Sequence, residues 1–216
     1  MFQYHPPKSP WLEIIYRDED ILVVNKPSGL LTVPGKAAEH RDSVWWRVTT
    51  ALPTARIVHR LDMATSGILV MALHKKAQGE LGKQFEQRLV HKIYEAVVFG
   101  QLAQARGEVD LPLRCDWPNR PKQMIDFIDG KAAFTEYRVM KVESDRTRVE
   151  LQPKTGRSHQ LRVHMLSLGH PILGDRLYGE PLATPMASRL LLHAREIEFL
   201  HPISRQALRF QIPTPF

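Results

Sequence analysis

The sequence predicts an α+β fold built around a large mixed sheet whose strands are mostly antiparallel. Three observations support this fold class. Short apolar runs rich in strand-forming residues outnumber the segments with helical periodicity. Several of these runs follow one another directly and are joined by short turns, as antiparallel strands are. The 216 residues, of which 43% are hydrophobic and 25% charged, suffice for one large domain with a substantial core.

We expect a single domain over residues 11–216, preceded by an extended arm over residues 1–10. The arm holds three prolines and few side chains that could pack. Two strands joined by an acidic turn are then expected at residues 14–16 and 21–24. Asp42-Ser43 can cap a helix that Pro53 ends.

Trp45 and Trp46 lie side by side on this expected helix. One indole could be exposed for stacking, but packing of both in the core is the favoured interpretation. Further along, residues 111–123 read as an irregular loop that holds cations and Trp117. A loop of this composition suits a nucleic-acid grip as well as it suits an ordinary surface excursion.

The rest of the chain alternates strands with two helices. A helix is expected at residues 75–89, with Leu89 on its apolar side, and another at 159–168, where Ser158 caps the start and Gly169 ends the helix. The strands are expected at residues 68–72, 91–99, 132–142, 148–152, 190–192, 197–200 and 207–212.

Charge and composition limit the class of partner. The chain has 30 Lys and Arg against 23 Asp and Glu, a net charge of +7, which favours RNA, DNA or an anionic membrane surface. No apolar stretch approaches the roughly 20 residues that span a bilayer, and the first residues lack a secretory signal pattern. A single cysteine, Cys115, excludes an internal disulfide and a multi-cysteine zinc site. We therefore expect a soluble, cytoplasmic protein.

Asp62 is the first candidate for a catalytic group. It follows the pair His59-Arg60 and precedes the apolar run at 68–72, so it should lie on a loop at the mouth of a buried strand. Arg60 should help to keep its carboxylate ionised. From the spacing alone, a turn cap paired with Arg60 is favoured over a catalytic role, because structural acids outnumber catalytic ones.

Several separate motifs, in one order along the chain, carry a family resemblance that runs from about Trp11 to Phe210. They are His59-Arg60-Leu61-Asp62 with Thr65-Ser66-Gly67, Lys92-Ile93-Tyr94, Gly156 to His164, Gly169 to Asp175, and Leu191-Leu192-His193-Ala194. The chain thereby resembles the RluA family of pseudouridine synthases. The resemblance implies a pseudouridine-synthase catalytic domain with RNA-gripping loops, no cofactor and no metal. No accessory RNA-binding module is expected ahead of it.

The resemblance also implies roles for three residues. Asp62 would be catalytic, and Arg162 would pair with it and keep it ionised. Tyr94 would stack on the uracil of a uridine flipped out of the RNA, and its hydroxyl could take the proton from C5. Without the family match, a core aromatic is the favoured interpretation of Tyr94. Whether Asp62 attacks the ribose or the uracil ring is left open.

Contacts to the RNA are expected from seven side chains spread over the motifs and loops. They are His59, Arg60, Arg114, Arg120, Lys122, Arg157 and Leu192. Arg60 could fill the gap left by the flipped base or hold a flanking phosphate. The stretch from Cys115 to Gln123 resembles family members of dual specificity. We therefore expect a hairpin of 23S rRNA and the anticodon loop of certain tRNAs as substrates, and a monomeric enzyme.

Other interpretations remain open at this point. The chain could modify only rRNA or only tRNA, or it could be an RNA-binding or ribosome-assembly factor without catalysis. An RNA glycosidase that releases uracil is a further alternative. His159, His164 and His170 lack the spacing of a helical metal site, and no nucleophile-elbow pattern surrounds Ser66 or Ser158.

Overall fold

The structure is a computed structural model that describes residues 3–216. The chain divides into two compact units. The first comprises residues up to His91 together with Ala194–Pro213, and the second comprises Lys92–His193 with Thr214–Phe216. Helices and strands both occur in each unit, so the α+β class is confirmed.

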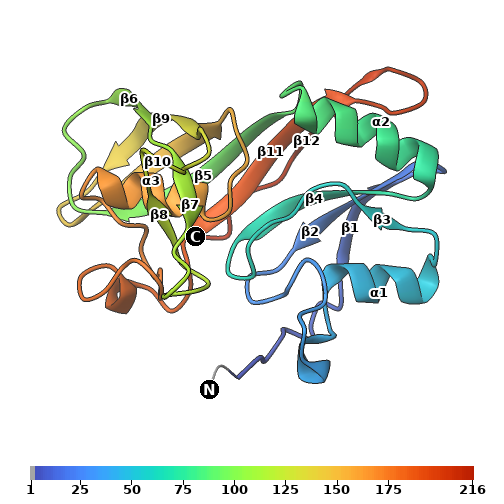
Figure 1. Cartoon of the computed structure of the whole chain (residues 1–216), viewed down its shortest axis with the longest axis horizontal. Coiled ribbons are helices and arrows are strands. Elements are labelled where there is room, and N and C mark those ends of the chain that lie inside the picture. Colours follow the sequence, from blue (N-terminus) through green and yellow to red (C-terminus); the bar gives the residue numbers. More distant parts are fainter. Residues whose placement is uncertain (1–2) are drawn as a thin grey trace. The chain divides into compact units, whose positions relative to one another are not determined.

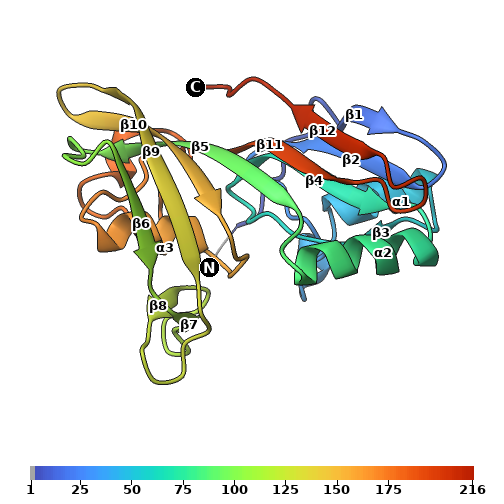
Figure 2. The same ribbon diagram turned by 90° about the horizontal axis from the view of Figure 1, so that it is seen from above.

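The first unit contains a sheet and two α-helices. Its elements are β1 (Glu13–Arg17), β2 (Ile21–Lys26), η1 (Ala38–His40), α1 (Val44–Ala51), β3 (Arg56–Ile57), β4 (Ser66–Ala72), α2 (Lys75–Glu86), most of β11 (Leu192–Leu200) and β12 (Ala207–Gln211). The strand order is β1-β2-β4-β11-β12, with β3 also beside β4. Figure 2 shows α2 running along one face of these strands.

The core of the first unit lies between this sheet and α2. All seven residues of β4 are buried, as expected for a strand that reads as a continuous apolar run. Ile21, Val70 and Leu81 are each 0% exposed and belong to one cluster that also includes Phe199. This packing fixes the start of β4. Asp62 lies four residues before that strand begins.

The second unit contains a four-stranded antiparallel sheet, a helix and a separate ribbon. Its elements are β5 (His91–Phe99), β6 (Arg106–Asp110), β7 (Leu113–Cys115), β8 (Gln123–Ile125), β9 (Phe134–Val142), β10 (Arg146–Pro153), α3 (Gln160–Ser167) and η2 (Thr184–Met186). The sheet has the order β5-β10-β9-β6, and β7 pairs with β8. Figures 1 and 2 show the β7–β8 ribbon extending beyond β6 and β9.

Most expected elements are confirmed, and the strands differ from the prediction in several places. Residues 111–123 are not wholly irregular, because β7 lies within them and pairs with β8. Two expected strands, at 190–192 and 197–200, are one strand, β11. The short strands β3 and β6 were not predicted at all. Each pairs with a longer strand whose position in the sheet is not visible in the local sequence.

The ends of two helices also differ from the prediction. The helix expected to reach residue 89 stops at Glu86, Arg88 takes a left-handed φ of 60°, and Leu89 is 49% exposed. Ser158 does not cap α3, because the N-cap is His159 with a left-handed φ of 54°. Gly169 does follow α3 with a φ of 82°, as expected.

The arm and the tryptophans need correction as well. Tyr4 is half-buried in the first unit, where its hydroxyl donates to the carbonyl of Asp42 at 2.8 Å and accepts from the amide of Leu31 at 2.9 Å. The arm therefore does pack. Ser43 caps α1 as predicted, but Trp45 is 37% exposed, so the prediction that both indoles are core residues is wrong. Residues 1 and 2 of the expected arm lie outside the described residues.

Candidate active site

Asp62 lies on a tight turn immediately before β4. The amide of Thr65 donates to the carbonyl of Asp62 at 3.1 Å, and the carboxylate-bearing residue itself is half-buried. The buried strand that follows anchors the turn on one side. The position is the loop at the mouth of a buried strand that the sequence predicts.

A second segment, residues 28–32, holds the Asp62 turn from the other side. The hydroxyl of Thr32 donates to the carbonyl of Leu61 at 2.7 Å and accepts from its amide at 3.2 Å. The hydroxyl of Ser28 donates to the carbonyl of Ala64 at 2.7 Å, and the amide of Gly29 donates to the carbonyl of Met63 at 2.8 Å. Residues on both sides of Asp62 are thus hydrogen-bonded, which restricts the backbone that aims the carboxylate.

Lys26 adds a buried cation to the same turn. Its side chain is 0% exposed, and Nζ donates to the carbonyls of Pro27 (3.0 Å), Leu30 (2.7 Å) and Met63 (3.0 Å). Three carbonyl acceptors match the three N–H groups of an ammonium. Lys26 therefore ties the turn after β2 to the residue next to Asp62.

Gly67 explains one part of the Asp62 motif. It has a φ of 117°, and a Cβ there would lie 2.3 Å from the carbonyl oxygen and 2.6 Å from the amide nitrogen of Ala194. Only glycine allows β4 and β11 to approach this closely within the first unit. The motif thus combines a candidate catalytic acid with a packing requirement of its strand.

His59 and Arg60 have different surroundings. Nε2 of His59 accepts the amide N–H of Val70 at 2.9 Å, and its ring stacks on Phe85 with centroids 4.6 Å apart. This ring therefore has a structural role in the first unit, and its contact with substrate stays a prediction. Arg60 is exposed, as a residue that meets RNA should be.

Arg162 is buried in the second unit in a bidentate ion pair that was not predicted. Its Nε and one terminal nitrogen donate to the two carboxylate oxygens of Asp175, each at 2.7 Å. Arg162 is 4% and Asp175 1% exposed. The guanidinium also lies 5.0 Å from the ring of Tyr178. Asp175 fixes the orientation of Arg162, whose expected pairing with Asp62 stays a prediction.

Tyr94 lies on β5 and is half-buried, opposite Leu151 of β10. Lys92, two residues before it, points to the same face of the strand. Burial lowers the pKa of Lys92 from 10.5 to about 8, and its Nζ donates to the carbonyl of Thr155 at 3.3 Å. The role of Tyr94 toward substrate stays a prediction.

The β7–β8 ribbon carries three of the predicted RNA contacts. Arg120 lies over the ring of Trp117 at 3.8 Å, and that indole is 60% exposed. Arg114 pairs with Asp126 at 2.7 Å, and Lys122 is half-buried. An exposed indole with a stacked guanidinium is the combination that single-stranded nucleic acid binds.

The last two predicted contacts, Arg157 and Leu192, lie outside the ribbon, as His59 and Arg60 do. Arg157 is exposed before α3, and its Nε donates to the carbonyl of Ala132 at 3.0 Å. Leu192 begins β11 and is 3% exposed, so it offers very little surface to a ligand. Its substrate contact stays a prediction that the burial does not favour.

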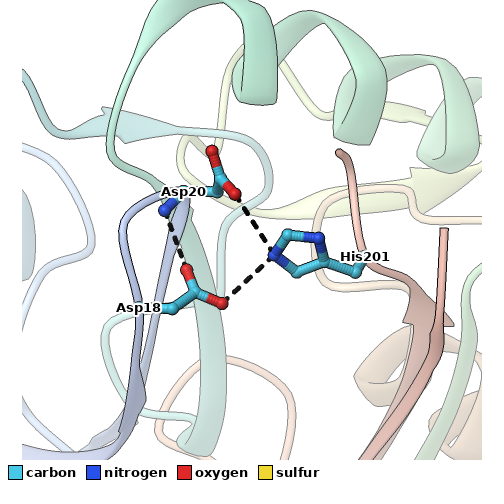
Figure 3. A group of neighbouring side chains, drawn as sticks. All are labelled: Asp18, Asp20 and His201. Atoms are coloured by element: carbon cyan, nitrogen blue, oxygen red, sulfur yellow. Dashed lines mark hydrogen bonds and ion pairs between the residues drawn. The ribbon is translucent and has the colours of Figure 1, made fainter. Parts of the chain in front are cut away.

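One group of possible metal ligands occurs in the first unit, and Figure 3 shows it. Nε2 of His201 lies 3.1 Å from a carboxylate oxygen of Asp18 and 3.6 Å from one of Asp20. Nδ1 of the same ring faces the amide N–H groups of Ser204 (3.0 Å) and Ile203 (3.3 Å), so it must accept. The ring proton then sits on Nε2, toward the carboxylates, and the pattern favours a structural cluster over a metal site.

The three histidines considered from the sequence each have their own protein partner. Nδ1 of His159 contacts the hydroxyl of Tyr178, and Nδ1 of His170 contacts the carbonyl of Phe99, both at 2.7 Å. His164 is 0% exposed, and burial lowers its pKa. These contacts give all three histidines structural roles.

Comparison with known proteins decides the family. The sequence pattern of the family described as RNA pseudouridylate synthase matches residues 20–167. The chain belongs to this family. The enzyme named dual-specificity RNA pseudouridine synthase RluA of Escherichia coli K12 is 56% identical over all of this chain and 99% of its own length. Its namesake in Vibrio cholerae is 54% identical over 100% of this chain and 88% of its own.

Solved structures agree with the family assignment. Human RNA pseudouridylate synthase domain containing 1 superposes with a TM-score of 0.81 at 31% identity and covers 98% of this chain and 87% of its own. Human RNA pseudouridylate synthase domain containing 4 superposes with a TM-score of 0.76 at 26% identity. The match covers 94% of this chain and 88% of that protein's chain. This member of the pseudouridine synthase family is therefore an isomerase that acts on uridines in RNA.

Three residues near the motifs of this pseudouridine synthase were not predicted from the sequence to have a role. Asp175 ends a segment that was recognised as a family motif, so its position was visible but its partner was not. Lys26 stands at the end of an apolar run beside Pro27, where a charged residue signals either exposure or a specific buried partner. Tyr178 shows no local signal.

Proposed function

We propose that this pseudouridine synthase modifies uridines in both a hairpin of 23S rRNA and the anticodon loop of certain tRNAs. The single observation that supports dual specificity is the likeness, at 54–56% identity over the whole chain, to enzymes whose names state it. The loop at residues 111–123, which from the sequence suits a nucleic-acid grip and an ordinary surface excursion equally, carries the exposed Trp117 with Arg120 over its ring, and this is consistent with a grip on looped RNA.

Asp62 is the proposed catalytic residue. The target uridine leaves its stack and enters the site, because its glycosidic bond is out of reach inside a helix. The C1′–N1 bond breaks, the base turns, and a new bond forms between C1′ and C5. The proton on C5 then leaves, and N1 ends with a proton, so the reaction is a balanced isomerisation. Asp62 acts as an anion toward the ribose or the uracil ring.

Arg162, Tyr94 and Arg60 are proposed to support this step. A buried guanidinium favours the ionised form of a nearby carboxylate, and the pair with Asp175 uses two of the five N–H groups of Arg162. Tyr94 would stack on the flipped uracil and accept the proton from C5. Exposed Arg60 would take the place of the flipped base or hold a flanking phosphate.

Further parts of the proposal concern partners and location. We propose a monomer that works in the cytoplasm without metal or cofactor. Within residues 3–216, no helix is both long and apolar enough to cross a membrane. The chemistry above requires only a carboxylate, an acceptor for the C5 proton and side chains that hold the flipped uracil in place.

A tritium-release assay tests this function. Uracil labelled at C5 is supplied in tRNA and, separately, in 23S rRNA fragments. The wild-type chain should release tritium from both, and Asp62→Asn should slow release by roughly 10⁴-fold while RNA binding is retained. Glu19→Gln, a change at an exposed acid of the same unit, is the matched control and should leave release unaltered.

The possible failures have different meanings. Release from rRNA alone would contradict dual specificity and leave the reaction class intact. Free uracil on chromatography would indicate an RNA glycosidase. An Asp62→Asn protein with normal turnover would show that the catalytic group lies elsewhere.

A further inference from the structure

A pocket outside the Asp62 turn lies on the exposed side of α1 in the first unit. Its volume is about 430 Å³, and its walls are Pro34, Arg41, Trp45, Trp46, Thr49 and Thr50. None of the residues to which the catalytic or RNA-binding roles above were given lines it. Figure 1 shows α1 and the loop before it, which contribute these walls.

Two adjacent indoles, those of Trp45 and Trp46, line this pocket and differ in exposure. Trp46 is half-buried, with the guanidinium of Arg41 5.7 Å from its ring and Trp11 packed edge-on at 6.0 Å. Trp45 is 37% exposed. One turn later, the hydroxyl of Thr49 donates to the carbonyl of Trp45 at 2.8 Å, and the hydroxyl of Thr50 donates to that of Trp46 at 2.9 Å. Trp45 therefore presents an indole surface to solvent from an ordered helix.

The helix that carries Trp45 is held firmly from behind. Arg47 is 3% exposed, donates to both carboxylate oxygens of Asp42 at 2.7 and 2.8 Å, and lies 4.2 Å from the ring of Trp11. It also donates to the carbonyl of Pro7 at 2.7 Å. A fixed platform binds a planar ligand with little loss of side-chain entropy.

The charge of the pocket favours an anionic ligand. Arg41 is exposed and is the one charged residue among the walls. Asp42, its acidic neighbour, already forms the bidentate pair with Arg47. A nucleotide combines the two features that this pocket complements, a planar base for the indole and a phosphate for the guanidinium.

The pocket is connected to the Asp62 turn by two hydrogen bonds. The amide of Trp45 donates to the carbonyl of Thr32 at 3.0 Å, and the hydroxyl of Thr32 donates to the carbonyl of Leu61 at 2.7 Å. Leu61 directly precedes Asp62. Thr32 therefore joins the helix that carries Trp45 to the segment that carries Asp62, within the same unit.

We propose that this pocket is an RNA subsite in which an unpaired base of the substrate stacks on Trp45 and an adjoining phosphate contacts Arg41. The proposal rests on the proposed function, since it assigns a second nucleotide of the same RNA. RNA is favoured over a peptide because the walls supply one cation, and the chain carries a net charge of +7. Stacking on an indole tolerates any base, so the subsite adds affinity with little sequence preference.

The test compares RNA affinity and turnover of Trp45→Ala and Trp45→Phe in the full-length chain, with a labelled anticodon stem-loop as the probe. Trp45→Ala should weaken binding by about 5-fold to 150-fold, the value of one base–aromatic stack. Trp45→Phe keeps a stacking ring and should stay within about 3-fold of the wild-type affinity. KM should rise with Trp45→Ala, whereas kcat at saturating RNA should not fall in step.

Two further variants make the result specific. Ile14→Ala, at a residue of the same unit that is 57% exposed, should bind as the wild type does. Arg41→Gln should reduce the slope of log affinity against log salt by about one phosphate contact. Thermal unfolding of every variant separates loss of binding from loss of fold.

Each outcome bears on one claim. If Trp45→Ala binds RNA with wild-type affinity and still makes pseudouridine, the subsite alone is overturned. This holds whether the surface then serves a protein partner or none. Equal weakening by Trp45→Ala and Trp45→Phe would also overturn it. A wild-type chain that binds RNA but makes no pseudouridine would overturn the proposed function instead.

Discussion

Arg162 and Asp175 show how a buried charge is oriented in the second unit. The bidentate pair is nearly inaccessible to water, and one oxygen of Asp175 also accepts the amides of Leu177 (2.9 Å) and Tyr178 (3.2 Å). A buried ion pair contributes little net stability, because both ions lose their hydration. For an enzyme, the ion pair is useful because it fixes the direction of the guanidinium. The N–H groups of Arg162 that do not bind Asp175 are thereby oriented as well.

Asp175→Asn should therefore affect both stability and turnover. Removing one partner of a buried pair leaves the other charge uncompensated, which costs about 3–5 kcal/mol. For a chain of this length we expect the melting temperature to fall by roughly 6–20 °C. Turnover in the tritium-release assay should fall as well, because Arg162 loses its orientation.

The double variant Arg162→Met, Asp175→Asn distinguishes these effects. Removing both charges should restore part of the lost stability, since no unpaired ion remains buried. Turnover should not recover, because the proposed partner of Asp62 is absent. Recovery of turnover in the double variant would contradict the role of Arg162.

Lys92 gives a prediction about pH. Burial lowers its pKa from 10.5 to about 8, so the folded chain releases this proton while the unfolded chain still holds it. Because the unfolded state binds more protons in this window, the free energy of unfolding should rise as pH increases from 8 toward 10. Lys92→Met should remove that rise and should be more stable than wild type at pH 7.

Urea unfolding at pH 7, 8, 9 and 10 measures this effect. Lys141→Met is the control, since the side chain of Lys141 is 66% exposed. Its stability should follow the same pH dependence as wild type. Parallel curves for wild type and Lys92→Met would show that Lys92 is not the source of the pH dependence.

At the scale of elements, the β7–β8 ribbon meets α3 through an apolar cluster that includes Leu113 and Val163, and through the hydroxyl of Tyr178. The amide of Gln123, in β8, donates to the hydroxyl of Tyr178 at 2.7 Å. An amide can only donate, so that hydroxyl accepts there and can direct its own proton to Nδ1 of His159, also at 2.7 Å. His159 is the N-cap of α3, which carries Arg162. Tyr178 therefore links the ribbon to the helix within the second unit.

Tyr178→Phe should loosen this link and leave the ring beside Arg162. The lost hydrogen bonds should reduce stability by about 1–3 kcal/mol. RNA affinity should weaken several-fold, because the ribbon with Trp117 and Arg120 is less fixed, while kcat at saturating RNA should change little. Binding titrations and single-turnover release measure the two quantities separately.

Tyr137→Phe provides the matched tyrosine control. Its hydroxyl lies 3.5 Å from Oε1 of Gln104 and makes no described contact with the ribbon. RNA affinity should be that of wild type. If both phenylalanine variants lost affinity equally, the hydroxyl of Tyr178 would not be the link.

At the scale of the whole molecule, the chain distributes its candidate catalytic residues over two compact units. Asp62 belongs to the first, and Tyr94 and Arg162 belong to the second. The chain passes between the units after residues 91, 193 and 213. The first two of these points lie inside a continuous strand, β5 and β11 respectively, so no local feature of the sequence marks them.

The sequence by itself determined the elements whose signal is local. Alternation and apolar runs located β4, β5 and β9, Ser43 marked the start of α1, and Gly169 marked the end of α3. Separate motifs in one order also predicted the family, which the family match confirmed, and the candidate site residues, which stay predictions. These signals are properties of a few adjacent residues, so they survive without knowledge of the fold.

Only the tertiary structure decided which groups meet. The carboxylate that holds Arg162 lies 13 residues away, and the carbonyl of Met63 that Lys26 binds lies 37 residues away. The indole of Trp45 was assigned to the core by its type, yet the packing of α1 left it exposed. A side chain shows in the sequence what it can donate, accept or stack on. Its partner depends on how distant segments pack, and that is a property of the whole fold.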